Sequence, residues 1–318
     1  MIVFNILLIL AGIVLLVGGA EIFVRSATSV AKRLGMSNIV IGLTVVAFGT
    51  SAPELVVNVI SALSGTTDLA VSNIVGSNFA NILLILGIGA MIRSLRIKQE
   101  TTTKQIPFAL LAIVVAAVMG NDALLNGGTD NIITRGDGVV LIMFFLIFMY
   151  YTYGVARVVG EEDNVETYRL STTTLMFIAG ILGLIFGGKV IVENAVSLAT
   201  LAGLSESLIG LTIVAVGTSL PELATTVVAV RRGHIDLAIG NAIGSNIFNI
   251  FWVLGFTALL APIPVDPSTN TDFVATIFAT ALLFGFIFIH KRNHLQRWQG
   301  VLFVLLYIGY ISLAIFRG

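Results

Sequence analysis

Two glutamates stand in the middle of apolar runs, and each directly follows a proline. Residues 45–59 read VVAFGTSAPELVVNV and residues 213–227 read IVAVGTSLPELATTV, with Glu54 and Glu222 in equivalent places. A proline donates no backbone hydrogen bond, so the helix is interrupted and the carbonyl of Gly49 loses its helical donor. Carboxylates, hydroxyls and bare carbonyls are hard oxygen ligands that suit Ca²⁺ and Na⁺. We therefore interpret each stretch as a broken helix that contributes to a cation site.

The apolar segment after each glutamate carries polar residues spaced four apart, which share one face of a helix. They are Asn73, Ser77 and Asn81 in the first case, and Asn241, Ser245 and Asn249 in the second. Two carboxylates neutralise one Ca²⁺ or about two Na⁺ at low electrostatic cost, so competition for one site is the physical basis expected for exchange. The alternative for the asparagines at 73, 78, 241 and 246 is that they hydrogen-bond neighbouring helices.

Ten apolar segments are candidates for crossing a bilayer. They lie near residues 2–24, 38–64, 70–92, 106–120, 138–157, 172–197, 207–230, 235–260, 272–290 and 299–316. Hydrophobic residues make up 57% of the chain and charged residues only 11%, which fits a lipid solvent. The formal net charge of zero argues against a nucleic-acid partner, and the absence of cysteine excludes disulfides and thiol chemistry.

The two halves of the chain repeat each other at a constant offset of 168 positions (222 minus 54, and again 245 minus 77). Each half holds five segments, and an odd number makes the second half enter the bilayer from the opposite side. The sequence thus predicts an all-α polytopic membrane protein with ten transmembrane helices in two inverted-topology five-helix repeats, with discontinuous helices at the midplane. The repeats are expected over residues 1–157 and 172–318, joined by an acidic cytoplasmic linker over 158–171.

The distribution of positive charge predicts the orientation of the chain. Fourteen of the 17 Lys and Arg residues fall in loops that follow odd-numbered segments, and the exceptions are Arg135, Lys189 and Arg317. Because positively charged loops stay on the cytoplasmic side, both termini are expected to be extracellular or periplasmic. Residues 2–24 carry neither a basic start nor a cleavage site, so we interpret them as a retained helix rather than a signal peptide.

Some features also have a structural interpretation. Glu21 with Arg25, and Lys189 with Glu193 at the equivalent positions, are expected to form ion pairs near the membrane ends rather than to bind transported ions. The pattern Gly-Thr-Ser-x-Pro-Glu alone is typical of an ordinary helix start, with a hydroxyl cap and a proline in the first turn. Its occurrence in two equivalent apolar segments argues against that simpler interpretation. The three histidines lie in or beside the predicted inner loops and receive no role.

The paired motifs resemble the two alpha-repeats of the sodium/calcium exchanger family, part of the cation/calcium exchanger superfamily. The residues that carry the resemblance are GTSAPEL with GSNFANI, and GTSLPEL with GSNIFNI. It covers essentially the whole chain and is closest to the small prokaryotic members, since no large cytosolic insert separates the halves. The resemblance implies an antiporter in the inner or plasma membrane that moves Ca²⁺ against a Na⁺ gradient, without a cofactor.

The same resemblance implies the ion ligands. Ca²⁺ is expected on Glu54 and Glu222, with the carbonyls of Thr50 and Thr218. Na⁺ is expected on the side chains of Thr50, Thr218, Ser51, Ser219, Ser77 and Ser245 and on the carbonyls of Ala47 and Ala215, while Asn81 and Asn249 match the remaining midplane positions. Some family members carry aspartate where this chain has Asn249, which leaves K⁺ co-transport, proton coupling and stoichiometry open.

Three functional hypotheses follow. The favoured one is a Na⁺/Ca²⁺ antiporter that works by alternating access as a monomer, in which the long first and sixth segments slide as a pair. A second is a H⁺/Ca²⁺ exchanger, or a K⁺-assisted Na⁺/Ca²⁺ exchanger, because a glutamate can carry a proton in place of Na⁺. A third is a cation channel, which would need no counter-ion. An enzyme is least supported, because the buried carboxylates have no nucleophile, cofactor loop or histidine partner.

Overall fold

The computed structural model describes residues 2–64, 68–127, 130–156, 167–203, 215–289 and 293–317. This part of the chain is almost entirely helical, as predicted. Eight of its helices are long and apolar enough to cross a membrane, and the bent pair Asn38–Thr50 and Ala52–Ser64 makes a ninth. The seventh predicted segment, near 207–230, is described only from residue 215. The count of ten therefore stays a prediction, while the multi-pass helical fold is confirmed.

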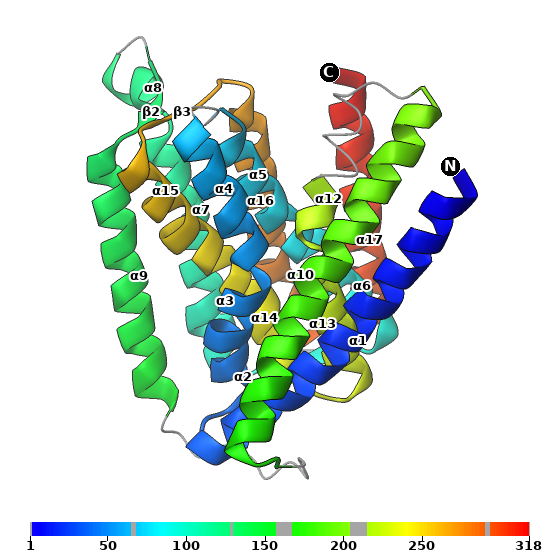
Figure 1. Cartoon of the computed structure of the whole chain (residues 1–318). Helices are drawn as coiled ribbons and strands as arrows, with labels where there is room; N and C mark the ends of the chain where they lie inside the picture. Colours follow the sequence, from blue (N-terminus) through cyan, green and yellow to red (C-terminus); the bar gives the residue numbers. More distant parts are fainter. Residues whose placement is uncertain are drawn as a thin grey trace.

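Two very long helices run side by side across the front of the molecule (Figure 1). They are α1, Ile2–Leu34, with 33 residues, and α10, Leu170–Leu201, with 32 residues. A bilayer needs only about 20 helical residues, so both must tilt or extend beyond the membrane. Glycines allow their backbones to touch: a Cβ added to Gly19 would lie 2.8 Å from the carbonyl carbon of Gly183. The first and sixth segments thus form one closely packed pair.

Both motif-bearing segments are broken helices. In the first, α2 (Asn38–Ile41), the π-helix η1 (Gly42–Val46) and α3 (Ala47–Thr50) lead to a 45° bend before α4 (Ala52–Ser64). In the second, α12 (Ala215–Thr218) is followed by Ser219, and α13 (Leu220–Arg231) begins directly after this residue. The prolines thus fall in the first turn of the second half-helix, where a missing N–H is tolerated. The predicted discontinuities are confirmed at equivalent positions.

The segments that follow the broken helices form the centre of the bundle. The first consists of α5 (Asp68–Ala80), the π-helix η2 (Asn81–Ile85) and α6 (Leu86–Ile92). The second consists of α14 (Ile235–Ile247), the π-helix η5 (Phe248–Leu254) and α15 (Gly255–Leu260). In each, 78% of the most apolar stretch is buried, against 22% in α1. These two segments therefore hold the polar stripes away from lipid.

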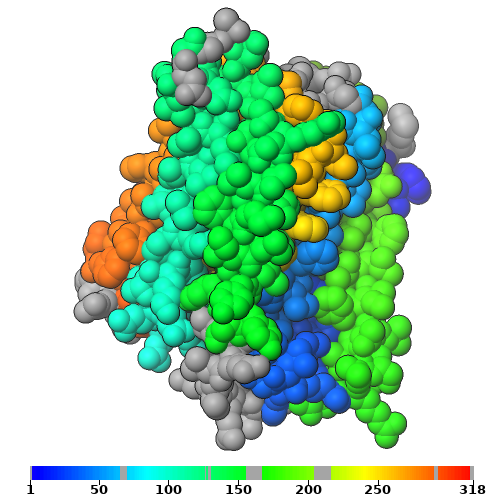
Figure 2. Space-filling view, turned by 90° about the vertical axis from the view of Figure 1, so that its left-hand side faces the viewer, coloured from blue at the N-terminus to red at the C-terminus, as the bar shows by residue number. Residues whose placement is uncertain are grey.

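The remaining helices surround this centre. They are η3 (Thr101–Gln105) continuing into α7 (Ile106–Met119), the short α8 (Asp122–Asn126), α9 (Arg135–Ala156), α16 (Thr269–Phe286) and α17 (Arg297–Arg317). Helix α9 packs on α15, α16 packs on α7 and α5, and α17 packs on α6. Figure 2 shows α9 in green beside α7 in teal on one face of the molecule. Exposed apolar side chains such as Met143 and Ile147 of α9 fit a surface that faces lipid.

Two short strand pairs tie the halves of the chain together. Strand β1 (Leu95–Arg96) pairs with β4 (His294–Leu295), and β2 (Ile132–Ile133) pairs with β3 (Ile263–Pro264), both antiparallel. Strand β1 and strand β3 are separated by the repeat offset of 168 positions, and each pairs with a strand of the other half. This reciprocal pairing is the arrangement expected of two repeats related by a pseudo-two-fold axis.

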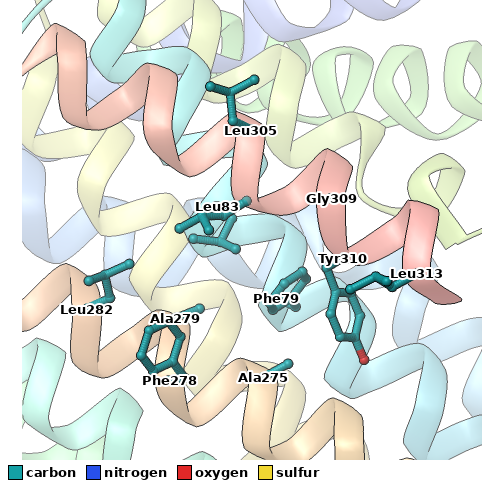
Figure 3. Close-up of a pocket in the computed structure, with 11 residues that line it drawn as sticks. Phe79, Leu83, Ala275, Phe278, Ala279, Leu282, Leu305, Gly309, Tyr310 and Leu313 are labelled. Atoms are coloured by element: carbon teal, nitrogen blue, oxygen red, sulfur yellow. The ribbon is translucent and has the colours of Figure 1, made fainter.

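An apolar groove of about 460 Å³ opens between α5, α16 and α17 (Figure 3). Its lining includes Phe79, Leu83, Phe278 and Leu305, and Phe278 and Leu305 are more than half exposed. At one end Tyr310 donates its hydroxyl hydrogen bond to a carboxylate oxygen of Asp272, so this polar group is satisfied where it borders the groove. The groove has the composition of a lipid-facing surface and lies apart from the buried polar centre.

Candidate ion-binding site

The two glutamates lie in the interior, and a hydrogen bond joins the two repeats at this point. Glu54 lies in the first turn of α4 and Glu222 in the first turn of α13, and both side chains are fully buried. The hydroxyl of Ser51, at the break in the first repeat, donates to Oε1 of Glu222 in the second repeat over 3.1 Å. A buried carboxylate is costly unless it is paired or ligated, so this arrangement calls for a positive partner.

Hydroxyl groups from the central helices reach the same carboxylates. Ser77 of α5 donates to Oε1 of Glu54 over 3.5 Å, and Ser245 of α14 donates to Oε1 of Glu222 over 3.4 Å. These two contacts are equivalent under the repeat offset. Thr50 donates to Oδ1 of Asn241 over 2.9 Å. The two serine contacts therefore place each predicted stripe against the broken helix of its own repeat, whereas the bond between Thr50 and Asn241 joins the two repeats.

Four asparagines form a symmetric set between the two central segments. Asn81 donates from Nδ2 to Oδ1 of Asn246 over 2.9 Å, and Asn249 donates from Nδ2 to Oδ1 of Asn78 over 3.0 Å. The amide nitrogens of Asn78 and Asn246 donate to each other's backbone carbonyls, over 3.0 and 3.2 Å. Asn78 and Asn246 thus bridge helices, as the structural alternative predicted. The nitrogens of Asn81 and Asn249 are also occupied, which fixes the orientation of their oxygens.

At the centre of the bundle, two carboxylate and two amide oxygens at repeat-equivalent positions lack a hydrogen bond to any residue that the structure describes. They are Oε2 of Glu54, Oε2 of Glu222, Oδ1 of Asn81 and Oδ1 of Asn249. All four are buried acceptors, and they come in equivalent pairs from the two repeats. A buried acceptor without a donor costs about 1–3 kcal/mol, and more if it is charged. Carboxylate and amide oxygens are the ligands that Ca²⁺ prefers, so the donor set fits this cation as a transported substrate.

The backbone at the breaks differs between the repeats. The carbonyl of Ala47, expected to bind Na⁺, accepts the amide of Ser51 over 2.9 Å and the hydroxyl of Thr50 over 3.3 Å. In the second repeat the amide of Ser219 bonds instead to the carbonyl of Val216 over 3.1 Å. Among the described residues, the Ser219 hydroxyl has no hydrogen-bond partner. The Ser219 side chain makes no capping hydrogen bond, and the Ser51 hydroxyl donates to Glu222 of the other repeat, which disfavours the simple helix-start interpretation. Ala215 begins α12, and Thr218 ends it.

Sequence reasoning missed two residues near the glutamates: Asn58, which bonds to the backbone of Glu54, and Thr226, which bonds to Asn241. Asn58 donates from Nδ2 to the carbonyl of Glu54 over 2.7 Å. In the second repeat Asn241 donates to the carbonyl of Glu222 over 3.3 Å and to the hydroxyl of Thr226 over 3.1 Å. Asn58 and Thr226 each follow their glutamate by four residues, which places them one turn further on the same helix face. That spacing was the signal available in the sequence.

The charged pairs near the membrane ends are present as predicted. Arg25 lies 2.9 Å from Glu21, and Lys189 lies 3.7 Å from Glu193. Arg232, at the end of α13, also forms an ion pair with Glu21 of α1. None of these groups belongs to the buried cluster around Glu54 and Glu222. His290 lies outside the described residues.

A multi-pass helical bundle with two broken helices and a buried pair of carboxylates defines an ion transporter of the inverted-repeat type. The chain belongs to the sodium/calcium exchanger family: the family profile described as Sodium/calcium exchanger protein matches residues 4–154 and 172–316. The protein is therefore a membrane transporter that exchanges cations, Ca²⁺ among them, and not an enzyme. The expected family membership is confirmed.

Relatives with names or solved structures agree with this assignment. The chain is 31% identical to the sodium/calcium exchanger MaX1 of Methanosarcina acetivorans, with 98% of each chain covered. It is 33% identical to the inner membrane protein YrbG of Escherichia coli, covering 93% of this chain and 92% of that one. The fold matches a solved structure of the sodium-calcium exchanger NCX_Mj with a TM-score of 0.83 and 32% identity, covering 98% of this chain and 99% of the other.

Proposed function

We propose that the protein exchanges Na⁺ for Ca²⁺ and that one Ca²⁺ binds between Glu54 and Glu222. The observation that carries the proposal is the set of four buried oxygens without hydrogen-bond donors, two from each repeat, around a pair of carboxylates. One divalent cation neutralises both carboxylates and satisfies oxygens that water does not reach. The carbonyls of Thr50 and Thr218, beside the two breaks, complete the proposed coordination.

Sodium ions are proposed to replace Ca²⁺ on the hydroxyl groups that already approach the carboxylates. Ser77 and Ser245 lie within hydrogen-bonding distance of Oε1 of the glutamate in their own repeat. The proposed Na⁺ ligands are the side chains of Thr50, Thr218, Ser51, Ser219, Ser77 and Ser245 and the carbonyls of Ala47 and Ala215, with Asn81 and Asn249 at the remaining midplane positions. Because either set of ions compensates the same two negative charges, Ca²⁺ and Na⁺ exclude each other, and this exclusion couples their fluxes.

Alternating access is proposed to come from movement of α1 and α10 against the rest of the bundle. These helices touch through glycine backbones and contribute none of the proposed ligands. When no ion is bound, the two charged carboxylates would have to stay uncompensated at the level of the hydrocarbon region during the transition, which is too costly. Only the ion-loaded protein therefore changes state. Since both repeats contribute ligands from one chain, a monomer is sufficient. The gap between the family-matched stretches, residues 155–171, overlaps the predicted linker over 158–171.

The exchange is tested by measuring uptake of radiolabelled Ca²⁺ into proteoliposomes under separately imposed gradients. We expect uptake with an outward Na⁺ gradient, and no comparable uptake with a pH gradient or a K⁺ gradient alone. Uptake driven by the pH gradient without Na⁺ would identify proton exchange instead. Downhill Ca²⁺ flux that needs no counter-ion would identify a channel.

A further inference from the structure

A polar pocket of about 640 Å³ lies at the end of the molecule where the basic residues gather, away from the ion site. Its wall is formed by the chain around β1 and by the start of α14, and it includes Arg93, Arg96, Lys98, His234 and Asp236. The pocket begins where α6 ends at Ile92 and where α14 begins at Ile235. Because both elements belong to membrane-spanning segments, the pocket lies at the level of the membrane boundary.

The charges in this pocket are not balanced. Lys98 lies 2.8 Å from Asp236, so these two charges compensate each other. The guanidinium groups of Arg93 and Arg96 have no hydrogen bond and no ion pair with any residue that the structure describes. Two positive charges therefore face the pocket without a partner among the described residues.

The geometry of the wall leaves room beside one of these guanidinium groups. Gly233 has a backbone φ of +85°, a conformation that favours glycine, and a Cβ placed there would lie 3.6 Å from Nη1 of Arg93. The Arg93 side chain thus extends over the turn that precedes α14, at the pocket. A guanidinium presents its N–H groups as a planar fork that matches the oxygens of a phosphate group.

We propose that this pocket binds a phosphate group through Arg93 and Arg96. At a membrane boundary the phosphate can come from the headgroup of an anionic phospholipid, and in solution it can come from free phosphate. The ligand class is the same in both cases, a phosphate with its negative charge compensated by two arginines. This binding is separate from Ca²⁺ and Na⁺ transport, because Glu54 and Glu222 are not part of the pocket.

The lipid source is tested by purifying the protein from membranes doped with phosphatidylglycerol and measuring retained lipid by native mass spectrometry. We compare the wild type with R93Q/R96Q and with R169Q/R231Q, which removes two exposed arginines outside this pocket. If each arginine makes one charge-assisted hydrogen bond to the bound phosphate, R93Q/R96Q retains phosphatidylglycerol about a hundred-fold less tightly. The R169Q/R231Q variant should behave like the wild type.

The free-phosphate source is tested on the same delipidated proteins by thermal unfolding with increasing inorganic phosphate at constant ionic strength. A rise in Tm with phosphate in the wild type and R169Q/R231Q, absent from R93Q/R96Q, supports phosphate binding from solution. Lipid retention without this rise supports the headgroup. The proposal is overturned if R93Q/R96Q matches R169Q/R231Q in both measurements, whatever the Ca²⁺ flux of the variants.

Discussion

Ser51 and Ser219 occupy equivalent positions at the two breaks, yet their hydroxyls are used differently. The hydroxyl of Ser51 donates to Glu222 across the repeat interface, whereas that of Ser219 has no partner among the described residues. The backbone differs as well: the amide of Ser51 bonds to the carbonyl of Ala47, four residues earlier, whereas the amide of Ser219 bonds to the carbonyl of Val216, three residues earlier. The two repeats are thus related in sequence but are not in the same local state.

This asymmetry gives a prediction at the residue scale. The substitution Ser51→Ala removes a buried hydrogen bond to a carboxylate and should lower the free energy of unfolding by about 1.5–3 kcal/mol. Ser219→Ala removes a buried hydroxyl that has no partner among the described residues, so no loss of stability is expected. Thermal unfolding without Ca²⁺ and Na⁺ measures both effects. Equal destabilisation by the two variants would contradict the assigned hydrogen bonding.

The sequence predicts which residue types meet at the centre, because Glu54 and Glu222 repeat at a fixed offset and the stripes of polar residues have helical spacing. It does not predict which side-chain atom of each asparagine bonds to a neighbouring helix and which is left for an ion. The side-chain nitrogen of Asn81 donates to Asn246 in the other repeat. This contact fixes the orientation of the amide, and the side-chain oxygen of Asn81 is left without a hydrogen bond among the described residues. Such orientation depends on contacts between segments that lie about half the chain apart, which a local pattern cannot contain.

At the scale of elements, the helices that carry Asn81 and Asn249 contain π-helical turns. The segments η2 and η5 begin at Asn81 and at Phe248, so they cover equivalent stretches of the two repeats. A π-turn inserts one residue into the helical turn and shifts the direction of later side chains, often at functional sites. The sequence predicted continuous helices here, since apolar periodicity does not distinguish an α-turn from a π-turn. The broken helices were predictable because proline leaves a local signal.

The glycine contact between α1 and α10 gives a prediction at the same scale. A Cβ at Gly19 would lie 2.8 Å from the backbone of Gly183, while a Cβ at the neighbouring Gly18 would meet nothing within 4 Å. Overpacking costs about 1–3 kcal/mol, so Gly19→Ala should slow Ca²⁺ flux by about tenfold or more if the helices slide. Equilibrium Ca²⁺ binding should change little, because neither helix carries proposed ligands.

Gly18→Ala is the matched control, since it places the same methyl group on the same helix one residue away. It should leave both flux and binding unchanged. The sliding proposal fails if Gly19→Ala transports at the rate of Gly18→Ala, provided both proteins are present in equal amounts in the vesicles.

At the scale of the whole molecule, the two longest helices, α1 and α10, extend beyond their predicted apolar segments. The first segment was predicted to end near residue 24, but α1 continues to Leu34. The additional turns carry Arg25, which pairs with Glu21, and Arg33, which donates to the carbonyl of Tyr168. Hydropathy marks the part of a helix that lies in lipid, whereas the end of the helix depends on backbone conformation and on contacts with other segments. The sequence therefore predicts the spans better than their ends.

The predicted orientation can be measured directly because the chain contains no cysteine. A single cysteine introduced by Ser268→Cys, in the loop before α16, should react with a membrane-impermeant maleimide in intact cells. One introduced by Gln99→Cys, beside the basic pocket, should react only after the cells are permeabilised. Both wild-type positions are exposed, so accessibility depends on the side of the membrane. The reverse labelling pattern would show that the termini face the cytoplasm.

The central claim is that Glu54 and Glu222 together hold the Ca²⁺ that Na⁺ displaces. It is tested most directly by equilibrium binding of radiolabelled Ca²⁺ to the purified protein, titrated with Na⁺. The account predicts one Ca²⁺ per chain in the wild type, displaced by Na⁺, and a loss of at least about a hundred-fold in affinity for both Glu54→Gln and Glu222→Gln, because each leaves a buried ion with half its compensating charge. Wild-type Ca²⁺ affinity in either folded variant would contradict it.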